Sequence, residues 1–138
     1  MAGELANGGE HLALDLLFRN AATPPSGIYL GLTTAAISDT DDLTTITEVD
    51  DGNYARQSVT FTAPSQVSEK GTIYNDSDVQ FGPWDTNEDG DISHAFLTDA
   101  GSGTTGTLIA WFALAETKSP LSGETLTINA DDLIFDID

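Results

Sequence analysis

The sequence predicts an all-β protein: one β-sandwich or jelly-roll-like domain over residues 1–138, with a single short N-terminal helix. Short apolar runs recur along the chain, segments rich in Gly, Pro, Ser, Thr or Asp separate them, and no helical pattern alternates with them. Strands at this spacing without intervening helices are typical of a sandwich. The chain has no Cys, so a core of this size must hold without disulfides.

The N-terminal segment contains the one predicted helix. Residues 1–9 are predicted to form an arm, and residues 9–19 to form a helix in which Leu12, Leu16 and neighbouring apolar side chains make one stripe. The Pro24–Pro25 pair ends the helical pattern. Packing of the stripe on a sheet is the preferred interpretation, and a subunit contact is the alternative.

Seven strands are predicted after the helix, each a run of aliphatic, β-branched or aromatic residues bounded by turn residues. They are Ile28–Thr34, Ala55–Thr62, Asp78–Phe81, Ile92–Thr98, Thr107–Ala115, Thr125–Asn129 and Leu133–Ile137. The segment Pro64–Gly71 is predicted to be a loop. A second loop, Ala35–Asp51, is long, acidic and rich in Thr. A loop of that length in a compact domain is typical of a functional or a disordered segment.

The charge balance excludes several classes of partner. Twenty-three Asp and Glu residues against four Lys and Arg residues give a formal net charge of -19. Binding of nucleic acid phosphates requires clustered basic residues.

The longest apolar run, around Leu108–Ala115, is too short to span a bilayer. We therefore expect no nucleic acid partner and no membrane partner, and an acidic surface that opposes aggregation.

Motifs of common enzyme classes are absent from the sequence. It contains no Gly-x-Ser-x-Gly elbow, no P-loop and no dinucleotide-binding fingerprint after a strand. The two histidines, His11 and His94, are far apart and have no neighbouring metal-ligand pattern. We therefore expect a non-enzymatic protein with no catalytic residues.

One loop resembles part of a calcium site. Asp85, Asn87, Asp89 and Asp91 occupy alternate positions, as in the first half of an EF-hand loop, and Asp91 would contribute its carbonyl oxygen. Position twelve is Phe96 rather than a bidentate Glu, which excludes a true EF-hand. Two interpretations stay open: a weak calcium site, or an acidic turn whose side chains bond their own backbone. No other cofactor is expected.

Arg56 and the two tryptophans are the other candidate functional residues. Arg56 is one of four basic residues and follows Tyr54 in a predicted strand. Its guanidinium is expected either to form a bidentate pair with a carboxylate, fixing a subunit or inter-sheet geometry, or to cover apolar surface with its stem. Trp111 lies in a strand whose two faces are both predicted to be buried, in the core or in an interface. Trp84 lies in a loop, and its exposure is left open.

Several segments resemble, in order, a family of tailed-bacteriophage virion proteins. They are Leu5–Glu10, Leu12–Leu17, Ile28–Thr33, Gly52–Phe61, Asn75–Val79, Ile92–His94, Thr98–Ala100, Leu108–Leu114 and Gly123–Ile128. Members of the family share a Gly-Tyr-Ala-Arg-Gln-x-Val-x-Phe core, and the chain has Gly52–Asn53–Tyr54–Ala55–Arg56–Gln57 at that place. They are often labelled phage tail fibre proteins, and some relatives are head decoration (cement) proteins.

The resemblance implies a structural virion protein. The leading interpretation is a capsid decoration protein on the outer capsid surface, which bridges capsomers and has the major capsid protein and further copies of itself, as a homotrimer, as partners. The alternative is a tail-fibre or tail-tip protein that binds a host surface receptor through loops and Trp84. A third interpretation is a calcium-dependent adhesion module.

The candidate interface residues come from several segments. They are Leu5, Leu12, Leu16, Tyr54, Arg56, His94 and Trp111. The helix and the arm Met1–Gly9 are expected to contact the shell or a neighbouring copy, and the arm is expected to be free in solution and ordered on assembly.

Overall fold

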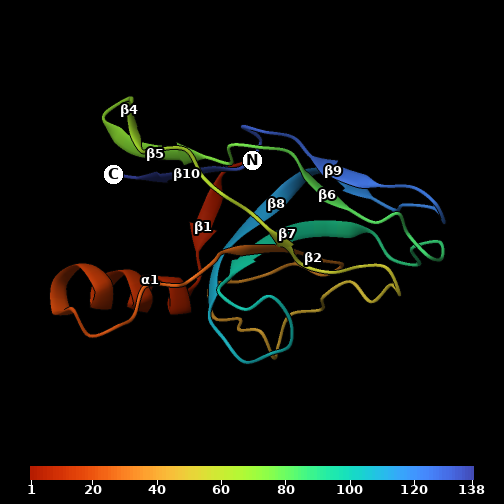
Figure 1. Cartoon of the computed structure of the whole chain (residues 1–138), viewed down its shortest axis with the longest axis horizontal. Helices are drawn as coiled ribbons and strands as arrows, with labels where there is room; N and C mark the ends of the chain where they lie inside the picture. Colours follow the sequence, from red (N-terminus) through yellow and green to blue (C-terminus); the bar gives the residue numbers. More distant parts are fainter.

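A five-stranded antiparallel sheet is the centre of the fold (Figure 1), which we describe for all of residues 1–138 from a computed structural model. Its strand order is β1 (Gly3–Leu5), β8 (Leu108–Lys118), β7 (Ile92–Thr98), β2 (Tyr29–Thr33) and β3 (Gln57–Ser58). A second sheet has the order β10 (Ile134–Ile137), β5 (Lys70–Tyr74) and β4 (Ser65–Val67), and a third pairs β6 (Val79–Phe81) with β9 (Leu126–Ile128). The predicted all-β class with one short N-terminal helix is confirmed.

The main core lies between the five-stranded sheet and the β6–β9 pair. Alternate residues of three central strands and of the pair face each other there, as the period-two pattern of half-buried strands requires. They are Leu30, Leu32, Ala95, Leu97, Ala110, Phe112, Val79, Phe81, Leu126 and Ile128. Burial of each large aliphatic or aromatic side chain stabilises the fold by roughly 1.5–3 kcal/mol.

A smaller core covers the opposite face of the five-stranded sheet. Phe96 of β7 lies there, packed with Ile37 and Leu43 from the long loop. Gly31 is paired with Phe96 on the neighbouring strand, and a Cβ at Gly31 would overlap the Phe96 ring. The loop Ala35–Asp51 is therefore a structural cover of the sheet, with apolar side chains inserted into the fold.

The prediction of a free N-terminal arm over residues 1–9 is wrong. β1 pairs with Ala110–Phe112 of β8, and the amino group of Met1 donates to the carbonyl oxygen of Asp132 at 2.6 Å. The helix α1 (Asn7–Leu14) begins two residues earlier than predicted. Hydrogen bonds of β1 to the sheet hold these residues in the folded body. A segment this short shows no alternation of apolar and polar residues from which the strand could be predicted.

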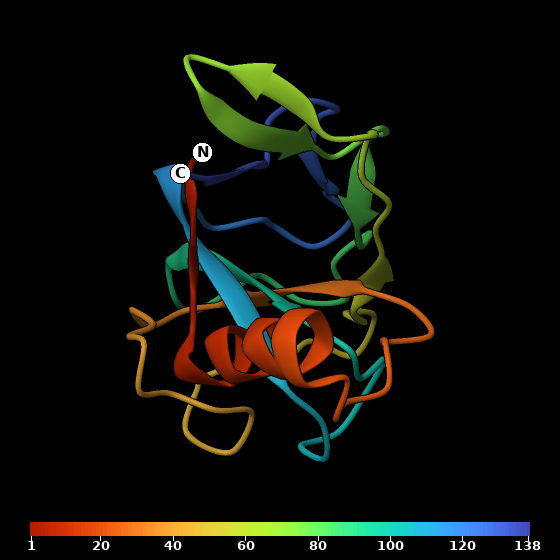
Figure 2. The same cartoon turned by 90° about the vertical axis from the view of Figure 1, so that its left-hand side faces the viewer.

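The predicted packing of the helical stripe on a sheet is wrong for its outer residues. α1 continues into a π-helical turn, η1 (Asp15–Arg19), in which Leu17 and Phe18 are 74% and 79% exposed. α1 packs on β8 and β1, whereas the only strong packing partner of η1 among the helices and strands is α1. The helix projects from the strands at the left of Figure 1, and in Figure 2 it points towards the viewer. Neither segment, nor any other helix, is long and apolar enough to cross a membrane.

The predicted loop Pro64–Gly71 is wrong in part, because it contains β4 and the start of β5. Ser68 and Glu69 have φ of 51° and 71°, the left-handed conformation of a two-residue hairpin turn. All three residues of β4 are exposed, so no buried alternation marks the strand. The predicted strand Ala55–Thr62 is reduced to the two residues of β3 and an isolated bridge at Phe61.

Candidate functional site

Arg56 is the centre of a partly buried hydrogen-bonded cluster. Its Nε and Nη2 donate to the two carboxylate oxygens of Glu48 at 2.8 and 2.7 Å. Its Nη1 and Nη2 donate to the carbonyl oxygens of Ala100 and Gly103, both at 2.8 Å. The guanidinium carbon lies 5.2 Å from the centroid of the Phe96 ring. The predicted bidentate pair with a carboxylate is confirmed, and it forms within one chain.

Tyr54 extends the Arg56 cluster towards the central sheet. Its hydroxyl accepts a hydrogen bond from the backbone N–H of Leu32 at 2.8 Å and donates to Oε1 of Glu48 at 2.9 Å. Its ring stacks on Phe81, with centroids 5.9 Å apart. Burial, and then the negative charge of Glu48, raise the pKa of Tyr54, so the hydroxyl stays a donor. The cluster therefore ties the loop that carries Glu48 to β2 and to the loop after β7.

The cluster has the chemistry of a structural clamp. The side chain of Arg56 is 3% exposed, and its hydrogen bonds go to groups of its own chain. An interface role for Tyr54 and Arg56 stays a prediction. Their hydrogen bonds hold loops of the same chain in place, so both residues lie beneath the outermost layer of the surface. Leu5 lies in β1 opposite Ala110 and packs against the main core.

The rings of His94 in β7 and Trp111 in β8 lie side by side. Nδ1 of His94 is 2.8 Å from the hydroxyl of Ser93, and its ring is tilted by 49° against the indole of Trp111. The indole N–H of Trp111 donates to Oδ1 of Asp39 at 3.1 Å. The second face of this strand is not fully buried within one chain, because Trp111 is half-buried and Ala113 is exposed. Burial of this face in an interface, with His94 and Trp111 as contact residues, stays a prediction.

Acidification is expected to destabilise the protein partly through His94. Burial lowers the pKa of His94 below its ordinary value of 6.5, so the unfolded chain binds a proton more readily than the folded one. The contribution of His94 to stability is present above pH 6.5 and is lost as the pH falls through the folded-state pKa. Urea unfolding at pH 7 and pH 5 should therefore show a smaller loss for His94→Gln than for the wild type. His11→Gln, at an exposed histidine of α1, is the control and should match the wild type.

Trp84 is buried, with 2% of its surface exposed. Its indole N–H donates to Oε2 of Glu88 at 3.0 Å, and its backbone N–H donates to the carbonyl oxygen of Glu124 at 2.8 Å. An indole in this position presents no face on which a sugar could stack. Trp84 is therefore not available to bind a host receptor, as the receptor-binding interpretation required.

Tryptophan fluorescence should separate the two indoles. The variant Trp111→Phe retains only the buried Trp84, whose emission is expected to lie at shorter wavelength and to resist quenching by acrylamide. The variant Trp84→Phe retains only the half-buried Trp111, whose emission should be quenched more readily. Equal quenching of the two variants would contradict the burial of Trp84.

The side chains of two of the four predicted calcium donors accept hydrogen bonds from the chain itself. The four are Asp85, Asn87, Asp89 and Asp91. Oδ1 of Asn87 accepts from the backbone N–H of Ser122 at 2.9 Å, and Oδ1 of Asp91 accepts from the hydroxyl of Ser119 at 2.6 Å. No group of three or more acidic or histidine side chains is arranged so that it could hold a metal ion. Calcium binding by this loop stays a prediction, which calorimetry at millimolar calcium tests.

Three of the six exposed large apolar side chains, including the two most exposed, gather at the end of the helix. We call Leu14, Leu17 and Phe18 the helix tip; they are 55%, 74% and 79% exposed. Leu12 and Leu16, the predicted interface residues of this segment, are half-buried beneath them. Arg19 ends the turn and pairs with Asp15 at 2.7 Å. The tip is an apolar projection on an otherwise acidic protein, and exposed apolar groups of this kind mark contact surfaces.

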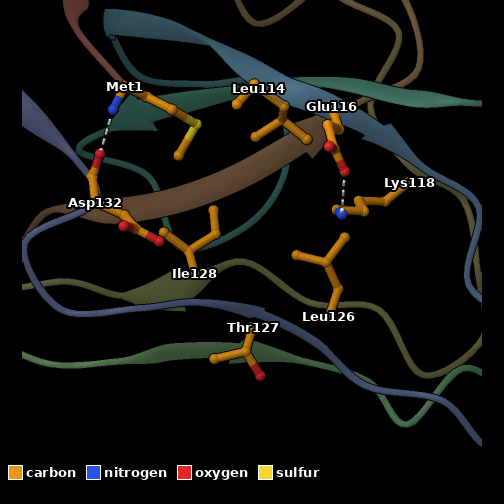
Figure 3. Close-up of a pocket in the computed structure, with 9 residues that line it drawn as sticks. Met1, Leu114, Glu116, Lys118, Leu126, Thr127, Ile128 and Asp132 are labelled. Carbon is orange, nitrogen blue, oxygen red and sulfur yellow. Dashed lines mark hydrogen bonds and ion pairs between the residues drawn. The ribbon is translucent and has the colours of Figure 1, made fainter.

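A groove of about 290 Å³ lies between the second half of β8 and β9. We call it the β8–β9 groove. Its apolar lining consists of Met1, Leu114, Ala115, Leu126 and Ile128, and its polar rim includes Glu116, Lys118 and Asp132. Figure 3 shows Leu114 on one side, Leu126 and Ile128 on the other, and Met1 at one end.

The model of a protein family described as "Podophage GP4 fiber I protein gp80" matches residues 4–136. The chain belongs to this family. No curated protein matches the chain. Members of the gp80 family are virion proteins of tailed phages, so the chain has a structural role in a phage particle, and the predicted virion location is confirmed at this level.

Sequence reasoning missed three parts of the surface of this gp80-family protein. Glu48, the partner of Arg56, is one of twenty-three acidic residues and carries no local pattern that distinguishes it. The β8–β9 groove joins Met1 to residues more than a hundred positions away, and no sequence pattern reports such a pairing. The exposure of Phe18 was not predicted either, because it depends on how far the helix lies on β8.

Proposed function

We propose that the chain is a non-enzymatic assembly protein of a phage fibre, held in the particle by protein–protein contacts. The helix tip carries this proposal. It is an apolar projection on a chain of net charge -19, and the body of the protein leaves it uncovered. Burial of such side chains against a partner is the main favourable contribution to protein association.

The placement in a fibre follows the name of the family, which is that of a fibre protein. The name by itself does not separate a fibre protein from the capsid decoration protein that the sequence resemblance first suggested. The burial of Trp84 supports an assembly role within the fibre over recognition of a host glycan. We expect no cofactor for this function.

Capsid decoration is the second candidate. Under this alternative the protein lies on the outer capsid surface, contacts the major capsid protein and forms homotrimers that bridge capsomers. The sequence has no internal repeat of the kind that builds a long fibre shaft, and this favours a compact surface module. Many weak contacts at equivalent capsid sites would then act together.

Copy number in purified virions distinguishes the two candidates. A fibre protein should occur at a small multiple of the symmetry of the tail, whereas a decoration protein should scale with the number of capsomers. Labelled protein should correspondingly lie at the tail or over the whole shell in images of the particle. Absence of the protein from purified virions, or measurable turnover by the isolated chain, would refute the proposed function.

The helix tip should be needed for incorporation. Virions produced with Phe18→Asp in place of the wild type should carry much less of the protein, because the charge opposes burial of the tip. Val67→Asp is a matched control, since Val67 is also an exposed apolar residue but lies in β4, outside the tip. Equal incorporation of the two variants would show that the tip does not hold the protein in the particle.

A further inference from the structure

We propose that the helix tip of one copy inserts into the β8–β9 groove of a second copy. This inference rests on the proposed function, since it names the partner of the same apolar projection. The helix that carries the tip and the groove lie at opposite halves of one strand: α1 packs on β8 near Ile109, and the groove begins at Leu114. One molecule therefore presents both surfaces at the same time.

The tip has the form of an inserting element. η1 extends beyond the part of the helix that packs on β8, and Figure 1 shows this helical segment projecting from the strands. Leu17 and Phe18 of η1 are 74% and 79% exposed. Asn20, with φ of 48°, reverses the chain directly after the turn. The projection is therefore narrow and carries its largest side chains at its end.

The groove has the matching apolar character. Leu126 and Ile128, which are 7% and 3% exposed, belong to the core cluster and form a rigid side, while Leu114 and Met1 close the opposite side and one end. β1 pairs with β8 only at residues 110–112, so no strand of the same chain covers the edge of β8 beyond Phe112 on that side. Side chains of the protein therefore line the groove, and no other part of the chain occupies it.

The repulsion between two strongly acidic molecules should be smaller at this contact than elsewhere on their surfaces. Two copies of net charge -19 repel each other, and the contact should form where basic residues reduce that repulsion. Arg19, whose side chain is 70% exposed, flanks the tip beside Asp15. Lys118, 54% exposed, lies on the groove rim beside Glu116. Docking lets each pair exchange partners, Arg19 with Glu116 and Lys118 with Asp15.

The contact joins two different surfaces, so it is heterologous. Each copy offers one tip and one groove, and repetition of the contact gives a closed ring or an open filament, depending on the rotation between copies. A homotrimer is one such ring. The same geometry would also carry a fibre, in which each copy inserts into the next.

Disulfide trapping tests the contact directly, because the chain has no Cys. A Leu17→Cys chain is mixed with a Leu114→Cys chain under mild oxidation, and a disulfide between the two variants is expected. A Val67→Cys chain, with its thiol on the exposed β4 strand, replaces Leu17→Cys in the control and should cross-link far less. Equal yields in the two mixtures would overturn the inference.

Oligomeric state and charge reversal give an independent test. The purified wild type should form oligomers in light scattering after size exclusion, and Leu17→Asp should shift them to monomers with unchanged circular dichroism, since Leu17 is exposed. Arg19→Glu should weaken association at least several-fold, and adding Glu116→Lys should restore it. A monomeric wild type, or an Arg19→Glu chain that associates normally, would refute the inference. These tests use no virions, so their outcome is separate from that of the copy-number experiment.

Discussion

Replacing Arg56 with Ala is expected to lower the free energy of unfolding by about 3 kcal/mol. The substitution leaves the carboxylate of Glu48, whose side chain is 26% exposed, without its cation, and removes the donors to the carbonyl oxygens of Ala100 and Gly103. A buried charge that loses its partner costs more than the intact pair contributes. Urea unfolding followed by circular dichroism measures the change.

Arg19→Ala is the matched control for Arg56→Ala. Both arginines pair with a carboxylate at 2.7 Å, but the side chain of Arg19 is 70% exposed and that of Arg56 is 3% exposed. The loss for Arg19→Ala should stay below about 0.5 kcal/mol at protein concentrations low enough to prevent association. Similar losses for the two variants would show that the Arg56 cluster does not hold its loops in place.

The strands that were predictable from sequence are those that bury one face. Ile92–Thr98 has the same bounds in prediction and structure, because its alternating apolar residues supply the main core on one face and Phe96 on the other. The β4–β5 hairpin lacks such a signal: β4 is fully exposed, and its turn residues are Ser68 and Glu69 rather than Asn-Gly. These edge segments are strands because they are hydrogen-bonded to a neighbouring strand. The local pattern of apolar and polar residues does not encode that pairing.

The candidate site also has a part that the sequence could predict and a part that it could not. The bidentate pair of Arg56 was one of two interpretations that the sequence left open, the other being an arginine whose stem covers apolar surface. Its partner Glu48 was not predictable, because long-range folding of the loop over the sheet selects it from many acids. The exposure of the helix tip depends on where α1 rests on β8, and Gly9, where a Cβ would overlap the carbonyl oxygen of Ile109, allows that close approach.

Gly9→Ala is expected to destabilise the protein by about 2 kcal/mol, although the same change in an ordinary helix interior stabilises by about 1 kcal/mol. A Cβ at Gly9 would overlap the carbonyl oxygen of Ile109 and lie 2.8 Å from its carbon. Both contacts are with backbone, so no side chain can rotate away. The helix must therefore move off β8, which removes contacts along the whole of α1 and displaces the tip.

Amide exchange identifies the cause of that loss. The backbone N–H of Ala6 donates to the same Ile109 oxygen at 3.0 Å, so its exchange should accelerate in Gly9→Ala more than that of the amides in β7. Gly27→Ala is the control, because a Cβ there would meet only Tyr29, at 3.6 Å, an ordinary contact distance. A stable Gly9→Ala protein with an unchanged Ala6 amide would contradict direct contact between helix and strand, and with it the reason why the helix end projects from the fold.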